Sequence, residues 1–101
     1  MKHYKVGYEA EASRDLDDIY FWIAENGGEG IATAFEQRLR AWCEGLDLFP
    51  KRGEARDDLM PGLRIVTFER SVSLAYLIGD QTVDIVRFLY RGRSLETAFD
   101  P

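Results

Sequence analysis

Most of the side chains suited to binding or chemistry lie in the second half of the chain. The candidate cluster consists of Arg64, Arg87, Tyr90, Arg91 and Arg93. Arg87 falls inside an otherwise apolar predicted strand, where a guanidinium needs a partner because burying it unpaired is costly. Neighbouring antiparallel strands would bring the cluster together on the sheet face away from the helices. Two interpretations remain open: a binding site for an anionic or protein ligand, or structural ion pairs with Asp84, Glu69 or Glu96.

Structural roles are expected for the other reactive residues. The only histidine, His3, lies in a short predicted strand, and the only cysteine, Cys43, lies on the apolar side of a predicted helix, where a thiol is inert. The carboxylates of Asp15, Asp17 and Asp18 fall in the first half of a helix, where they oppose the helix dipole favourably, and they are expected to face water. The sequence has no metal-ligand spacing or glycine-rich phosphate loop, so neither a metal nor a cofactor is expected.

The charge balance argues against free nucleic acid as the main partner. The 101 residues carry a formal net charge of −5, and residues 1–50 hold 5 Lys and Arg against 10 Asp and Glu. Residues 51–101 hold 8 Lys and Arg against 8 Asp and Glu, and all but one of these basic residues are arginines. Because phosphate contacts dominate affinity, a nucleic-acid-binding domain is usually strongly basic. This charge balance is compatible with a local arginine cluster.

Length and composition predict one globular domain, residues 1–101, in the cytoplasm. No apolar run approaches the ~20 residues that a membrane span needs. The N-terminus lacks the apolar stretch of a secretory signal, and a single cysteine cannot form an internal disulfide.

Apolar spacing predicts two helices, at residues 10–26 and 31–48, joined by a short linker as an antiparallel hairpin. The residues expected to be buried are Ala12, Leu16, Ile19 and Ile23 in the first helix and Ile31, Phe35, Leu39, Trp42 and Leu46 in the second. Two aromatic residues of the first helix, Phe21 and Trp22, are candidate exposed anchors for a protein partner.

Four strands complete the predicted fold. Residues 2–8 alternate as a short strand, and strands at 63–69, 72–78 and 82–90 follow the hairpin with tight turns between them. Turns this short require antiparallel neighbours. The expected fold is α+β, in the order β-α-α-β-β-β, with the helical hairpin packed on one face of an antiparallel sheet.

Taken in order, these segments resemble ParE-type members of the ParE/RelE toxin superfamily over about residues 4–96. The resemblance is carried by residues 4–6, 12–19, 22–25, 32–35, 46–53, 62–64 and 83–93. It implies the fold just described and a toxin of a type II toxin–antitoxin pair, of the kind associated with plasmid stabilisation. It also implies neutralisation by an antitoxin encoded beside the toxin.

The resemblance implies two alternative activities. ParE-like members inhibit DNA gyrase, whereas RelE-like members cleave mRNA on the ribosome with basic residues and a Tyr or His near the chain end. Where many relatives read Leu-His-Gly-Arg-Arg-Asp, this chain has Tyr90 in place of the histidine and Ser94 in place of the aspartate. We therefore expect a non-enzymatic gyrase inhibitor bound by a ParD-like antitoxin.

The expected contact residues differ between the alternatives. For gyrase inhibition, the target-binding residues are Arg87, Tyr90, Arg91 and Arg93, and the antitoxin-binding residues are Phe21 and Trp22. For mRNA cleavage, the site would consist of Arg64, Arg87 and Tyr90. A third possibility is a degenerate member of the family that binds only its antitoxin.

Overall fold

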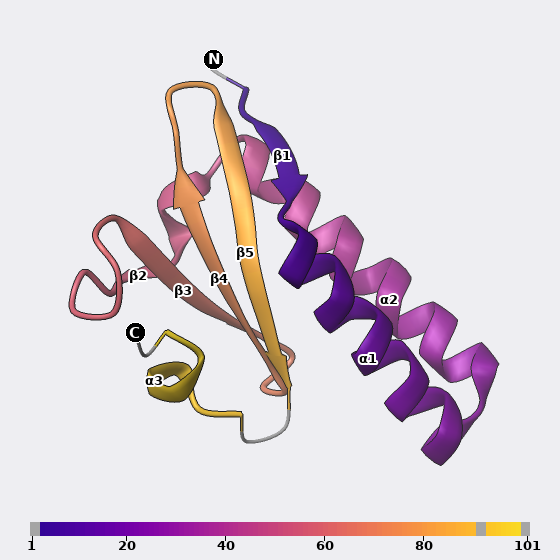
Figure 1. Ribbon diagram of the computed structural model, residues 1–101. Coiled ribbons are helices and arrows are strands. Elements are labelled where there is room, and N and C mark those ends of the chain that lie inside the picture. Colours follow the sequence, from indigo (N-terminus) through magenta and orange to yellow (C-terminus); the bar gives the residue numbers. More distant parts are fainter. Residues whose placement is uncertain (1–2, 91–92, 100–101) are drawn as a thin grey trace.

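The computed structural model describes residues 3–90 and 93–99, which form a helical hairpin on one face of a five-stranded sheet (Figure 1). The elements are β1 (Lys5–Tyr8), α1 (Ala10–Gly27), α2 (Glu29–Glu44), the 3₁₀ turns η1 (Gly45–Asp47) and η2 (Pro50–Arg52), β2 (Glu54–Ala55), β3 (Leu63–Phe68), β4 (Val72–Ile78), β5 (Thr82–Tyr90) and α3 (Leu95–Ala98). The sheet order is β1-β5-β4-β3-β2. The predicted α+β architecture is confirmed.

The sheet is mixed rather than wholly antiparallel. Strands β3, β4 and β5 form the predicted antiparallel meander, but β1 runs parallel to β5, with Lys5 opposite Thr82 and Tyr8 opposite Ile85. A parallel neighbour is possible because the chain returns to the sheet through the helical hairpin, a long crossover that places no constraint on direction. Strand β2, a two-residue strand between the hairpin and β3 that was not predicted, forms the opposite edge of the sheet.

A β-bulge decides which side chains of β5 face the hairpin. Ala75 pairs with Arg87 and its neighbour Tyr76 pairs with Ile85, so Val86 is an extra residue in β5. The bulge lets Ile85 and the side chain three positions later, Phe88, both enter the core beneath the hairpin. Arg87 consequently lies on the opposite face of the strand.

The predicted helical stripes are buried, with two exceptions. Leu16 and Phe35 are only 2% and 8% exposed, but Ile31 is 61% exposed, and Trp42 is half-buried. The prediction for Ile31 is wrong because α2 begins beyond the end of the sheet, where the tip of the hairpin has nothing beneath it (Figure 1). Gly28, with φ of 97°, joins the two helices in a conformation that favours glycine.

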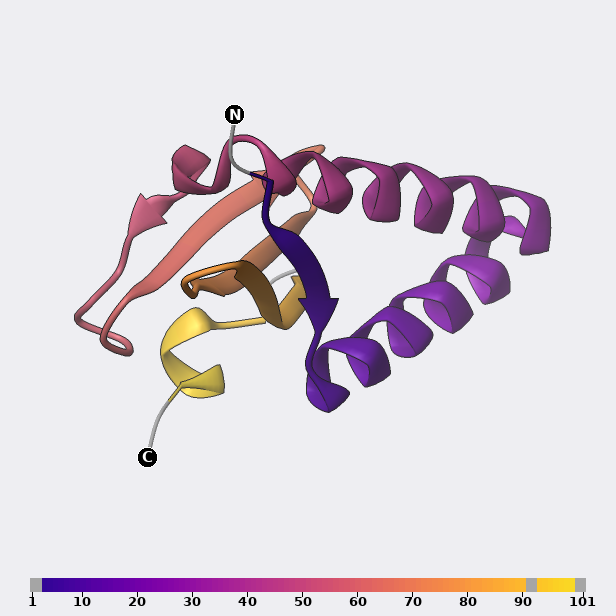
Figure 2. The ribbon, with the colours of Figure 1, turned by 90° about the horizontal axis from the view of Figure 1, so that it is seen from above.

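The face of the sheet away from the hairpin is covered by the C-terminal segment (Figure 2). Leu63, Ala75 and Leu89 lie on this face and are buried outside the main core. Ala98 and Phe99 lie beside Leu77 there, around a cavity of about 490 Å³. The four-residue helix α3 was not predicted, because it is too short to show a periodic pattern. In the described part of the chain, no helix has the length and apolar character needed to cross a membrane.

Candidate functional site

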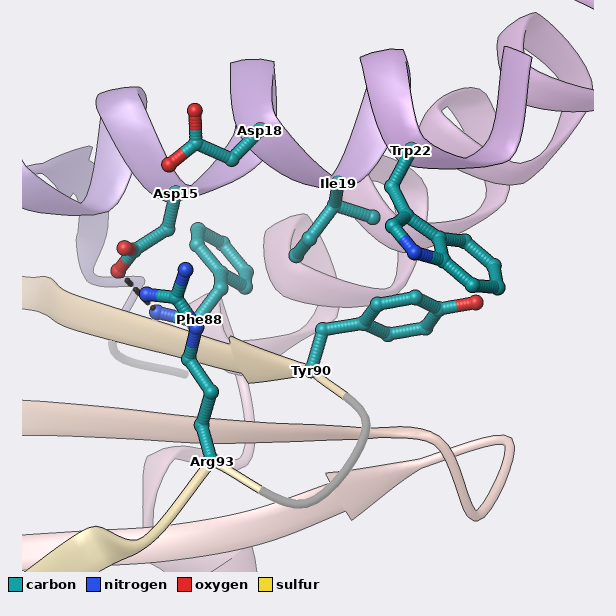
Figure 3. Close-up of a pocket in the computed structure, with 7 residues that line it drawn as sticks. All are labelled: Asp15, Asp18, Ile19, Trp22, Phe88, Tyr90 and Arg93. Atoms are coloured by element: carbon teal, nitrogen blue, oxygen red, sulfur yellow. Dashed lines mark hydrogen bonds between the residues drawn. The ribbon is translucent and has the colours of Figure 1, made fainter. Parts of the chain in front are cut away.

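The candidate site is a cavity of about 230 Å³ between α1 and the end of β5, which we call the seam cavity (Figure 3). It is lined by Asp15, Asp18, Ile19, Trp22, Phe88, Tyr90 and Arg93. The rings of Trp22 and Tyr90 meet edge to face, with centroids 5.5 Å apart. The exposed Arg93 extends from the segment after β5 toward α1. Trp22, predicted to contact the antitoxin, therefore lies beside two residues predicted to contact the target.

Asp15, which lines this cavity, forms a mostly buried ion pair with Arg87 of β5. Arg87 donates from Nε to Oδ2 of Asp15 at 2.7 Å and from Nη2 to Oδ1 at 3.1 Å. The backbone N–H of Phe88 donates to the same carboxylate at 2.9 Å. The hydrogen bond that Arg87 donates to Asp15 raises the pKa of Arg87 above its ordinary value, and Glu11 lies 3.6 Å from the guanidinium.

Asp15 corrects two expectations from the sequence. It was expected to face water but is only 6% exposed, because α1 turns this side chain toward β5. Arg87 does form an ion pair, but its partners are Asp15 and Glu11 rather than Asp84, Glu69 or Glu96. The spacing could have revealed this, since Asp15 lies three residues after Ala12 and therefore on the buried stripe.

Arg64 does not join Arg87, contrary to the predicted cluster. Arg64 is opposite Tyr76 and Arg87 is opposite Ala75, so their side chains leave the sheet on different faces. Arg64 Nη1 donates to the carbonyl oxygen of Gly53 at 2.6 Å. Of the remaining cluster residues, Tyr90 and Arg93 line the seam cavity, and Arg91 lies outside the described residues.

Three large apolar side chains of the helical hairpin are exposed. Phe21 and Trp22 are 62% and 40% exposed, as predicted, and the unexpectedly exposed Ile31 lies on the neighbouring helix. We call these three residues the hairpin tip. Large apolar side chains exposed on a surface are typical of a protein interface.

The other reactive residues take structural positions. Cys43 is fully buried, and burial raises the pKa of its thiol to about 12, so it is not a nucleophile at neutral pH. His3 is exposed, with Nδ1 3.2 Å from Oδ2 of Asp47. Within residues 3–90 and 93–99, no three His, Cys, Asp or Glu side chains are grouped as metal ligands would be.

Comparison with known proteins identifies the family. Residues 6–95 match the ParE toxin of the type II toxin–antitoxin system parDE. Toxin ParE3 of Caulobacter vibrioides is 34% identical over 77 residues, which are 76% of each chain.

Solved structures share the fold. The chromosomal ParDE system of P. aeruginosa superposes with a TM-score of 0.76 at 24% identity, covering 87% of this chain and 96% of that one. The RelBE2 toxin–antitoxin complex of Mycobacterium tuberculosis superposes with a TM-score of 0.62 at 23% identity, covering 92% of this chain and 97% of that one. With the family match over nearly its whole length, the chain belongs to the ParE family of toxins from type II toxin–antitoxin systems.

Proposed function

We propose that this toxin inhibits DNA gyrase and is held inactive by a ParD-like antitoxin. Membership of the ParE family supports the proposal. Because gyrase acts on bacterial DNA, the proposal places the toxin in the cytoplasm. Ribosome-dependent mRNA cleavage is the alternative.

The observation that favours gyrase inhibition is that the arginines on β3 and β5 bind groups within the protein itself. An RNase must neutralise a phosphate and activate the 2′-hydroxyl, so its cations and a proton acceptor must converge. The guanidinium of Arg87 is already bound by Asp15, and that of Arg64 is bound to Gly53 on the other face of the sheet. Tyr90 lies against Trp22 in the seam cavity. These three residues do not converge on one reacting atom.

A gyrase inhibitor requires only a complementary surface. The C-terminal end of β5 offers Tyr90 and Arg93 beside the seam cavity, and Arg91 lies between them in the sequence. Arginines on such a surface can contact acidic groups of the target, which favours both encounter and specificity.

A DNA supercoiling assay and a ribosome-programmed cleavage assay separate the two activities. We expect the toxin to inhibit supercoiling and to leave ribosome-bound mRNA intact. The double variant Arg91→Ala/Arg93→Ala should lose most of the inhibition, while Arg38→Ala, which removes an exposed arginine on α2, should retain it. Cleavage of mRNA that disappears in Tyr90→Phe would establish the nuclease alternative instead.

The hairpin tip is the proposed antitoxin surface. Trp22→Ala should weaken antitoxin binding by about 2 kcal/mol, or roughly 30-fold in dissociation constant, because buried tryptophans dominate the energy of interfaces. Calorimetry with the antitoxin encoded in the neighbouring reading frame measures this change. Asp17→Ala removes an exposed side chain of the same helix and is the control. Equal affinity of wild type and Trp22→Ala would remove Trp22 from the antitoxin site.

A further inference from the structure

One exposed aromatic side chain lies far from the hairpin tip. Phe49 is 56% exposed and follows the C-terminal end of α2. The thirteen residues of α2 that separate Ile31 from this end span about 20 Å at 1.5 Å per residue. The hairpin tip and Phe49 therefore cannot contact the same small element of a partner.

Phe49 belongs to a group that we call the loop patch, which consists of Trp42, Phe49, Lys51 and Arg52. The guanidinium of Arg52 lies 5.4 Å from the ring centroid of Trp42 and 5.8 Å from that of Phe49, so it stacks on both aromatic faces. Lys51 and Arg52 are exposed, and within the described residues neither forms an ion pair with a carboxylate. Aromatic residues and arginine are the types that contribute most to binding energy at protein interfaces.

The backbone beneath the loop patch is held by buried polar contacts. The hydroxyl of Tyr76, a fully buried residue, donates to the carbonyl oxygen of Pro50 at 2.7 Å and accepts the N–H of Gly53 at 2.8 Å. Arg64 donates to the carbonyl oxygen of Gly53 from the other side. A Cβ on Gly53 would lie 2.8 Å from the Tyr76 hydroxyl and 2.9 Å from the carbonyl oxygen of Ile65, so only glycine fits here.

These contacts fix an exposed, cationic turn before any ligand arrives. A preorganised surface loses less conformational entropy on binding, so more of its contact energy appears as affinity. The turn does not need Lys51 and Arg52 for its own stability, because the polar contacts that hold it involve backbone groups and the side chains of Tyr76 and Arg64.

We propose that the loop patch is a docking surface for an acidic segment of a partner protein. Carboxylates of the partner would bind Lys51 and Arg52, and its apolar side chains would cover Phe49 and Trp42. The proposal does not depend on gyrase inhibition, and the loop patch shares no residue with the hairpin tip.

Charge decides between protein and nucleic acid as the occupant. Arginine stacked on aromatic rings also suits single-stranded nucleic acid. A polyanion, however, needs a track of cations, and the loop patch offers two in a chain of net charge −5, with the exposed Glu54 beside them. A short acidic peptide segment matches two cations between aromatic faces.

Nuclear magnetic resonance titration of the ¹⁵N-labelled toxin, residues 1–101, tests the proposal. The probe is a synthetic hexapeptide of alternating Glu and Leu; the comparison ligands are the same peptide with Lys replacing Glu and a hexauridine RNA. We expect the acidic peptide to shift the amides of Phe49, Lys51 and Arg52 and the indole N–H of Trp42. Its dissociation constant should rise about tenfold in Lys51→Gln/Arg52→Gln and on raising the salt concentration.

Two variants serve as controls. Arg40→Gln removes an exposed arginine of α2 that stacks on Tyr8, and it should bind the acidic peptide as wild type does. Trp22→Ala should also bind the acidic peptide as wild type does. Binding at the loop patch is thereby distinguished from antitoxin binding, which Trp22→Ala should weaken. The proposal is overturned if the acidic peptide leaves the loop patch unshifted, if the lysine peptide binds equally well, or if the RNA binds the same residues more tightly.

Discussion

Two arginines on opposite faces of the sheet, Arg87 and Arg64, are used in different ways. On β5, Arg87 binds the buried Asp15 of α1 and, together with the Phe88 N–H, fastens a helix to a strand; we call this the helix clamp. On β3 and β4, Arg64 and the Tyr76 hydroxyl fasten the backbone at Gly53; we call this the loop clamp. The helix clamp depends on opposite charges, whereas the loop clamp binds neutral peptide groups.

The difference separates cations that hold the fold from cations that are free to bind a partner. Arg87 is bound by two carboxylates, and Nη1 of Arg64 is bound by backbone carbonyl oxygens. The loop clamp nevertheless leaves Lys51 and Arg52 exposed. An arginine within a strand is therefore weak evidence for a ligand site, and an exposed cation on a fixed backbone is stronger evidence.

The largest expected loss of stability comes from breaking the helix clamp. Asp15→Ala should lower the free energy of unfolding by about 3 kcal/mol, because it removes the nearest carboxylate from a mostly buried guanidinium and leaves the Phe88 N–H without its acceptor. Denaturant unfolding followed by circular dichroism measures the loss. The matched control is Asp17→Ala on the same helix, where the side chain is exposed and the expected change is within about 0.5 kcal/mol.

A double variant tests whether charge is the reason for this effect. Asp15→Ala/Arg87→Ala should be less destabilised than the sum of its two single variants, because neither charge is then left unpaired. Additive losses would show that packing around α1, and not the ion pair, accounts for the stability of the helix clamp.

A smaller effect is expected at the loop clamp. Tyr76→Phe leaves the carbonyl of Pro50 and the N–H of Gly53 without their partner, which should cost about 1–2 kcal/mol. Amide hydrogen exchange at Gly53 should accelerate, while α1 keeps its protection. Tyr90→Phe is the control, since the Tyr90 hydroxyl makes no hydrogen bond within the described residues. Unchanged exchange at Gly53 would contradict the role given to Tyr76.

Apolar periodicity was sufficient to predict the main elements. Leu16 and Leu39 are buried because three- and four-residue spacing places them on the inner side of each helix. The strand bounds at 72–78 and 82–90 agree with the structure, because glycine and polar residues mark the turn between them. The exposure of Phe21 and Trp22 was also predicted from their position beside the first stripe.

Features that depend on tertiary contacts could not be predicted from the sequence pattern. The bulge at Val86 reverses the facing of the later β5 residues, and no local pattern marks it. The parallel direction of β1 depends on the path of the chain after the hairpin. The role of Tyr76 depends on Gly53, a residue that is distant in sequence.

Breaking an ion pair outside both clamps should have the smallest effect on stability. Arg38 donates to Glu69 from Nε at 2.9 Å and from Nη2 at 3.0 Å, but the two side chains are 52% and 42% exposed, and such pairs contribute little to stability. The hydrogen bond from Arg38 lowers the pKa of Glu69. Arg38→Gln should raise that pKa toward the usual value for glutamate, as measured by a nuclear magnetic resonance pH titration of the side-chain carboxyl.

The sign of the accompanying stability change follows from the lowered pKa. A carboxylate with a depressed pKa in the folded state stabilises the fold above its unfolded pKa, and this contribution is lost as the pH falls through the folded value. Wild type should therefore melt slightly above Arg38→Gln at pH 7, and the difference should vanish as the pH falls below the pKa of Glu69. If Arg38→Gln instead destabilises the fold at pH 7 as much as Asp15→Ala does, burial does not explain the strength of the helix clamp.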